Sequence, residues 1–71
     1  MTTSIDAKTI GAYLKQLRGT KTQSEVANAV GVTPMAISQY ECGERIPRDE
    51  IKIRLASYYD RTVEQLFFNH R

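Results

Sequence analysis

The sequence predicts an all-α fold, a compact domain of five short helices. Three observations support this prediction. Apolar residues recur at helical rather than strand spacing along most of the chain. Hydroxyl residues followed three positions later by glutamate or glutamine mark helix starts at 22–25 and 62–65. Glycines at 19, 31 and 43 then stand where helices should end.

The first helix is expected over residues 7–18. Its apolar residues have i, i+3, i+4, i+7 spacing and therefore share one face: Ile10, Tyr13, Leu14 and Leu17. Gly19 ends it. The segment 22–25 then starts a second helix, which runs to about Val30 and buries the residues Val26, Ala27 and Val30.

Gly31 follows the second helix, at a position where a positive φ angle is favourable. Thr33 and Pro34 open a third helix, with a hydroxyl at the cap and proline at the first helical position. This helix ends at Cys42 and Gly43, and residues 43–47 form a loop. A fourth helix covers about 48–59, and a short fifth helix follows the capping-box spacing at 62–65.

Composition limits the function classes. A chain of 71 residues allows one small domain, expected over 1–71 with its ordered part at about 6–68. The sequence has no apolar run of transmembrane length and no signal-peptide stretch, and its one cysteine is Cys42, so a cytoplasmic location without membrane partners is expected. The net charge of +2 permits a polyanionic partner without requiring one.

Residues that could support catalysis are sparse. The single histidine is His70, next to the chain end and expected to be part of a tail. The sequence has no glycine-rich phosphate loop, no metal-ligand spacing and no nucleophile with a base nearby in sequence. We therefore expect no enzymatic activity, no metal, no cofactor and no small-molecule ligand.

The segment 23–42 has the spacing of two helices that meet at a tight angle. Ala27 is a small residue at the point where the third helix must approach the second, and Gly31 lies at the turn between them. Val32, Ile37 and Tyr40 supply the buried side of the third helix. This is the geometry of a helix-turn-helix, in which the later of the two helices, here the third helix of the chain, faces the DNA major groove. An αα-hairpin of another bundle fits the spacing equally well.

Four motifs, in this order, resemble the Cro/repressor-type helix-turn-helix family, also called the xenobiotic-response-element (Xre) family: Thr22-Gln23-Ser24-Glu25-Val26-Ala27, Gly31-Val32-Thr33, Ile37-Ser38-Gln39-Tyr40-Glu41 and Gly43-Glu44-Arg45-Ile46-Pro47. The resemblance covers about 8–68 and implies a lambda-repressor-like five-helix domain. It further implies a homodimeric transcriptional regulator of bacterial, phage or prophage origin, a repressor, that binds a double-stranded DNA operator. The turn before Gln23 is shorter than is usual in the family.

The resemblance also implies roles for individual residues. The outer side of the third helix would contact bases through Pro34, Met35, Ser38 and Gln39. Gln39 is the best candidate, because an amide can bond N6 and N7 of adenine together. This helix has no lysine or arginine, so part of the sequence choice would rest on DNA shape. A solvated helix surface is the alternative interpretation of these positions.

Phosphate contacts are implied for residues that flank this helix: Lys21, Thr22, Gln23, Thr33, Arg45 and Arg48. Capping by Gln23 and simple solvation of the arginines are the alternatives. Arg18 and Glu41 resemble the family's ion pair, with Gln16 as a second possible partner of Glu41.

Two exposed apolar candidates remain for a subunit contact, Ile53 and Phe68. A second function class stays open at this point, a protein-interaction module such as an antitoxin or anti-regulator. RNA binding is less favoured, because the third helix lacks exposed aromatic residues on its presumed contact face.

Overall fold

The computed structural model describes residues 6–68, which form five α-helices and no strand. The predicted all-α class is confirmed. The helices are α1 (Ala7–Arg18), α2 (Gln23–Val30), α3 (Pro34–Cys42), α4 (Asp49–Tyr58) and α5 (Val63–Phe67). The observed bounds agree with the expected ones except in the fourth helix, which is one residue shorter at each end. His70 lies outside the described residues.

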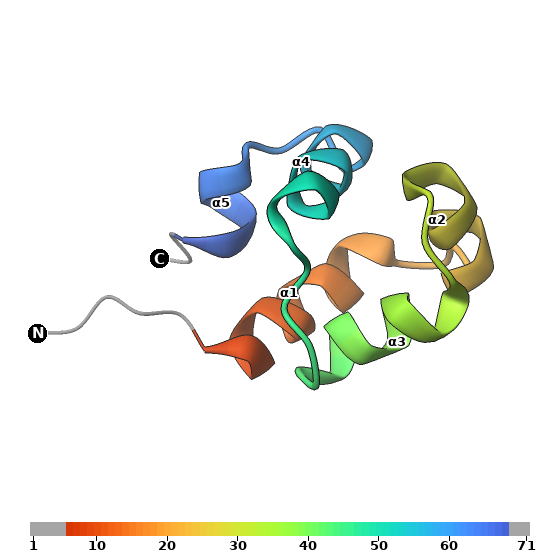
Figure 1. The fold of residues 1–71 in the computed structure, drawn as a ribbon, viewed down its shortest axis with the longest axis horizontal. Helices are drawn as coiled ribbons and strands as arrows, with labels where there is room; N and C mark the ends of the chain where they lie inside the picture. The colour runs from red at the N-terminus through yellow and green to blue at the C-terminus, as the bar shows by residue number, and fades with distance from the viewer. Residues whose placement is uncertain (1–5, 69–71) are drawn as a thin grey trace, which may run out of the picture.

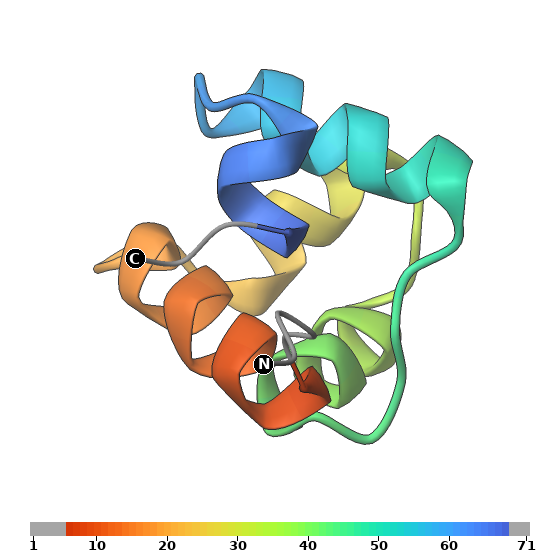
Figure 2. The same cartoon turned by 90° about the vertical axis from the view of Figure 1, so that its left-hand side faces the viewer.

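The five helices pack as a closed ring around one core. α1 packs against α3 and α5, α2 against α3 and α4, and α4 against α5. Figures 1 and 2 show α1 and α3 on one side of this ring and α4 and α5 on the other. Each helix turns its buried residues inward, and all five contribute: Ile10, Leu14, Val26, Ala27, Val30, Ala36, Ile37, Tyr40, Ile51, Leu55, Ala56, Leu66 and Phe67. Burial of this shared core orients every helix at once.

Side-chain caps fix where the helices begin. The hydroxyls of Thr22, Thr33 and Thr62 each accept a hydrogen bond from the backbone N–H three residues later. Both predicted capping boxes are present, with Glu25 and Gln65 as their second members. The carboxylate of Asp6 caps α1 by accepting from the Thr9 N–H at 2.8 Å, and this bond lowers its pKa.

A glycine inside α1 allows it to lie unusually close to α3. A Cβ atom placed on Gly11 would lie 2.4 Å from the carbonyl oxygen of Glu41 and 2.5 Å from that of Tyr40. Both are backbone atoms, which cannot move aside as a side chain can. Gly11 therefore sets the distance between the two helices, a role that the helical pattern of the sequence did not reveal.

Candidate nucleic-acid interface

The α2–turn–α3 unit has helix-turn-helix geometry. Gly31 takes the left-handed conformation predicted for it, with φ of 79°, and its N–H donates to the Ala27 carbonyl at 2.8 Å. The N–H of Val32 donates to the same oxygen at 3.0 Å. Ala27 is 1% exposed and belongs to the core that α2 shares with its neighbours. This compact turn sends the chain directly from α2 into α3.

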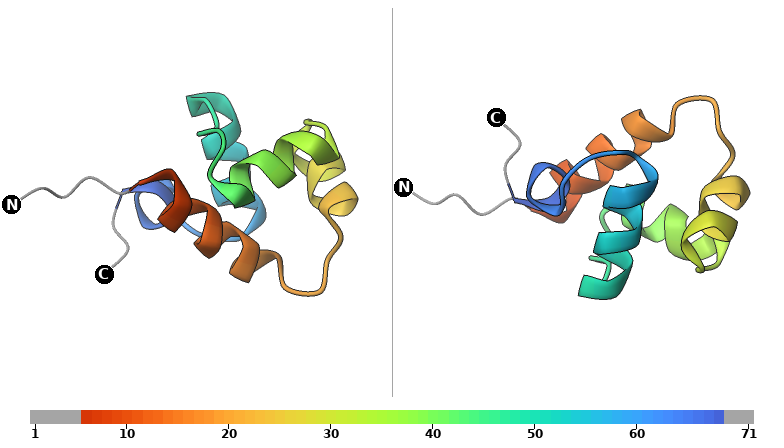
Figure 3. Two further views of the ribbon diagram at one scale, coloured as in Figure 1. Left: turned by 90° about the horizontal axis from the view of Figure 1, so that it is seen from below. Right: turned by 90° about the horizontal axis from the view of Figure 1, so that it is seen from above.

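α3 has one buried side and one open side. Ala36, Ile37, Tyr40 and Glu41 are buried against the ring of helices. Seen from below, no other helix covers α3 (Figure 3). The predicted base-contacting residues lie on its less buried side: Pro34 and Met35 are exposed, Met35 by 70%, and Ser38 and Gln39 are half-buried.

The first turn of α3 favours anions. The Oγ1 atom of Thr33 accepts from the Ala36 N–H at 3.1 Å, and Pro34 occupies the first helical position. This first turn carries no acidic residue. The positive end of the helix dipole is therefore not neutralised locally, and it lies beside the exposed Thr33 and Pro34.

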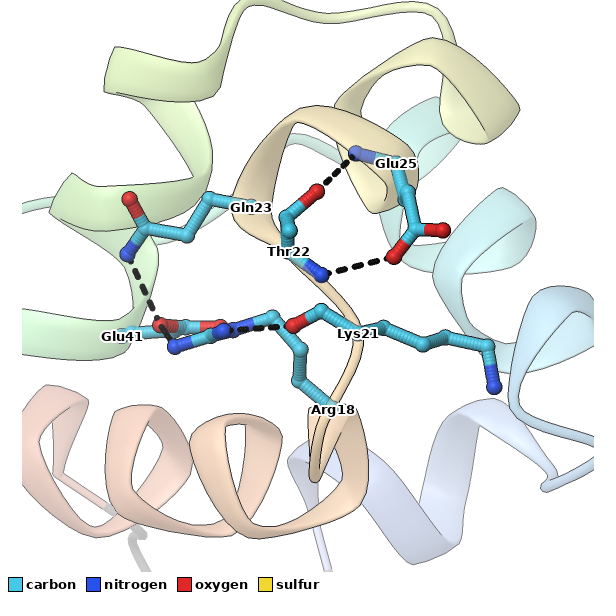
Figure 4. Close-up of polar contacts among 6 residues, drawn as sticks. All are labelled: Arg18, Lys21, Thr22, Gln23, Glu25 and Glu41. Atoms are coloured by element: carbon cyan, nitrogen blue, oxygen red, sulfur yellow. Dashed lines mark hydrogen bonds and ion pairs between the residues drawn. The ribbon is translucent and has the colours of Figure 1, made fainter.

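The other end of α3 is held by a polar network that joins three helices (Figure 4). Arg18 of α1 donates to Glu41 of α3 from Nε at 2.7 Å and from Nη2 at 3.1 Å. Gln23 of α2 donates from Nε2 to the same carboxylate at 3.1 Å. The Arg18 Nη1 also bonds the Lys21 carbonyl at 2.7 Å, which fixes the short turn before α2. Gln16 is exposed, and Arg18 holds Glu41 instead.

This network is shielded from water. The side chains of Arg18 and Glu41 are 16% and 4% exposed. The hydrogen bond to Glu41 raises the pKa of Arg18 above its usual value, so the guanidinium stays charged. Burial raises the pKa of the neighbouring Tyr59 to about 12, and the negative charge of Glu41 adds to this shift.

The residues proposed to contact phosphates at the start of α2 do not all lie together. The Thr22 hydroxyl and the Glu25 carboxylate are engaged in the capping box, at 3.0 and 2.8 Å. Gln23 points to Glu41, whereas the Lys21 side chain extends away from it (Figure 4). The Lys21 Nζ lies 6.0 Å from the ring of Tyr58.

An open groove of about 350 Å³ separates α3 from the start of α4. Thr33, Arg45 and Arg48 all line it, so the structure brings these three predicted phosphate contacts to one place. The connecting segment of residues 43–48 runs along the outside of the molecule (Figure 2).

Arg54 also lines this groove, although the sequence pattern did not predict a role for it there. It donates from Nη2 to Glu50 at 2.7 Å and from Nη1 to the Val30 carbonyl at 3.3 Å, so it ties α4 to the end of α2. The i, i+4 spacing of Glu50 and Arg54 could have indicated the ion pair. The contact with Val30, 24 residues away, left no local signal.

The two candidate subunit-contact residues are on the surface. Ile53 is 61% exposed and Phe68 is 59% exposed. The Lys52 Nζ lies 5.1 Å from the Phe68 ring and 5.6 Å from that of Phe67. Ile46, in the loop after α3, is a further exposed apolar residue, with 44% exposure.

Within residues 6–68, no group of three or more histidine, cysteine, aspartate or glutamate side chains is placed to hold a metal ion. The helices of this part of the chain are too short or too polar to cross a membrane.

The compact turn, the buried back of α3 and its open front define a helix-turn-helix DNA-binding domain. A helix-turn-helix family model matches residues 10–66, and the chain belongs to this family. A search among curated proteins finds no match.

Solved structures share the fold. One is the P22 c2 repressor in complex with a synthetic operator, with 27% identity and a TM-score of 0.80, covering 82% of this chain and 91% of that one. The restriction-modification controller protein C.AhdI from Aeromonas hydrophila has 27% identity and a TM-score of 0.73, with the same coverages. The biofilm regulator SinR in complex with DNA has 28% identity and a TM-score of 0.72, covering 80% of this chain and 95% of that one.

Proposed function

We propose that this chain is a sequence-specific transcriptional regulator, a repressor, that binds a double-stranded DNA operator. The observation that supports this most is the asymmetry of α3, which is buried along one side and uncovered along the other. The structural similarity to the P22 c2 repressor and to SinR, both solved with DNA, agrees with this function. Nothing in residues 6–68 favours an antitoxin or anti-regulator.

In this proposal α3 enters the major groove. Pro34 and Met35 offer apolar contact, for example to a thymine methyl group, and Ser38 and Gln39 offer hydrogen bonds to base edges. Gln23 would meet the phosphate backbone beside the C-terminal end of α3 through the amide N–H that its bond to Glu41 leaves free, and Thr22 and Lys21 would meet it separately at the turn before α2. Thr33, Arg45 and Arg48 would meet it along the groove between α3 and the start of α4. A protein with this role works where the DNA is, so we expect it in the cytoplasm.

The regulator would act as a homodimer. A twofold axis would place two copies of α3 about 34 Å apart, matching successive major grooves on one face of a duplex. Ile53 and Phe68 are exposed apolar side chains of the kind that subunit interfaces bury.

Selection of bound duplexes from a random pool tests both the sequence-specific binding and the dimer. We expect an enriched pseudo-palindrome with half-sites one helical turn apart, and an affinity that falls steeply with salt as counterions are released. A pool that shows no enrichment would rule out sequence-specific binding. An enriched site without twofold symmetry would contradict the dimer alone.

The dimer contact has its own test. Ile53→Asp should lower the dimer fraction in sedimentation, because it places a charge in an apolar interface. Asn28→Asp, at an exposed position of α2, is the control and should leave the fraction unchanged. Equal behaviour of the two variants would remove Ile53 from the interface.

A further inference from the structure

The loop that follows α3 folds back over the last turn of the same helix. Gly43 adopts φ of 81°, and the N–H groups of Glu44 and Arg45 both donate to the carbonyl of Gln39, at 2.9 and 3.3 Å. The guanidinium carbon of Arg45 lies 5.7 Å from the centre of the Tyr40 ring, which is 3% exposed. A buried ring and the backbone therefore hold Arg45 beside Gln39.

Arg45 also contacts the side chain that is proposed to select a base. Its Nη1 atom donates to Oε1 of Gln39 at 3.2 Å. An arginine side chain carries donors and no acceptor, so the amide atom that faces it has to be the oxygen. The Gln39 amide is thereby held with its oxygen at Arg45 and its two N–H donors away from Arg45.

The orientation of this amide decides what it can recognise. An unrestrained glutamine can rotate its amide by half a turn, which exchanges the positions of donor and acceptor. In the major groove adenine offers one acceptor and one donor, whereas guanine offers two acceptors. A rotating amide can match more than one base edge from the same position, and a fixed amide cannot.

We propose that Arg45 is a specificity-determining positioning residue, which fixes the Gln39 amide so that this side chain selects one base pair. The proposal rests on the proposed function. It adds to the phosphate contact of Arg45, because a guanidinium has five N–H donors and the bond to Gln39 uses one of them. Arg48 lies in the same loop, lines the same groove and has no bond to Gln39 in the described structure, so it supplies a matched control.

The test measures Kd for two duplexes, the selected operator and the operator changed at the one base pair whose preference Gln39→Ala abolishes. For the unchanged protein, the ratio of the two Kd values should be about 5 to 150, the discrimination of one good base contact. Arg45→Ala should reduce this ratio several-fold. Arg48→Ala should weaken binding to both duplexes and leave the ratio unchanged, because it removes only a phosphate contact.

A double variant completes the experiment. In the Gln39→Ala background, Arg45→Ala should change the affinity for both duplexes equally, since no amide remains to be positioned. If the alanine variant folds poorly by circular dichroism, the measurement is repeated with Arg45→Met, which keeps an unbranched apolar chain beside Tyr40 and removes the donors. Either single variant at Arg45 should reduce the ratio.

The possible failures are distinguishable. An Arg45→Ala or Arg45→Met protein that keeps the full ratio overturns the positioning role and leaves sequence-specific binding intact. A Gln39→Ala protein with unchanged preference at every base pair also overturns it. An unchanged protein that prefers no duplex in the selection contradicts the proposed function, and this inference with it.

Discussion

The two ends of α3 are held in different ways. At its C-terminal end, Glu41 is buried and bonded by Arg18 from α1 and by Gln23 from α2. At its N-terminal end, Thr33 and Pro34 are exposed, and the bond from the Ala36 N–H to Thr33 comes from the helix itself. One end is braced by long-range contacts and the other is left open. This division fits a helix that must keep its direction while offering its first turn to a ligand.

The largest expected effect comes from breaking the braced end. Glu41→Ala leaves Arg18 charged and poorly solvated, which costs about 3–5 kcal/mol for a buried pair. This is comparable to the whole stability of a domain this small. We therefore expect most of the cooperative urea transition, followed by circular dichroism, to be lost.

Glu44→Ala is the matched control for this variant. It removes an exposed carboxylate just past the end of the same helix and should change stability by less than about 0.5 kcal/mol. A Glu41→Ala protein that behaved like Glu44→Ala would mean that the network does not brace α3.

The next largest effect on stability should come from a change at the close approach of α1 to α3. Gly11→Ala places a methyl group against two backbone carbonyls, so the helices have to separate, at a cost of about 1–3 kcal/mol. On a solvated helix the same change would stabilise the protein by up to about 1 kcal/mol. The sign of the change in urea midpoint decides between these outcomes.

A change at the open N-terminal end of α3 should lower the stability less than a change at Glu41 does. Thr33→Ala removes the cap of α3 and should cost about 1 kcal/mol of stability, well below the loss at Glu41. Thr33→Ser keeps the hydroxyl and should retain most of this stability. Thermal unfolding of the three proteins measures the difference. A loss at Thr33 as large as that at Glu41 would contradict the contrast between the two ends.

The smallest effect appears at high pH. Tyr59 lines the same small pocket as Glu41, and its pKa is raised from 10.0 to about 12. Between these two values the unfolded chain loses the phenol proton more readily than the folded chain does. The free energy of unfolding should therefore fall as the pH rises from about 10 to 12.

Tyr59→Phe removes that contribution and should make the unfolding free energy less dependent on pH over this range. Tyr58→Phe, at the adjacent residue, is the control and should retain most of the dependence of the unchanged protein, because burial and Glu41 contribute more to the raised pKa of Tyr59 than Tyr58 does. Urea unfolding at several pH values measures both. An identical pH profile for Tyr59→Phe and the unchanged protein would show that Tyr59 contributes nothing to it.

The sequence alone determined the helices and their order. The caps at Thr22, Thr33 and Thr62 and the turn at Gly31 are local devices, in which a side chain or a φ angle acts on backbone a few residues away. Such devices leave a fixed spacing in the sequence, so they could be recognised there. The family's motifs follow the same local spacing, and they indicated which side of the third helix would be open.

Only the tertiary structure decided how the helices are positioned around the candidate site and which residues hold them there. The bond between Gln23 and Glu41 and the contact of Arg54 with Val30 join residues 18 and 24 positions apart. The space beside Gly11 is set by backbone more than 28 residues further on, at positions 40 and 41. Contacts of this kind depend on where whole helices come to rest after the core has packed, and no spacing along the chain records that outcome.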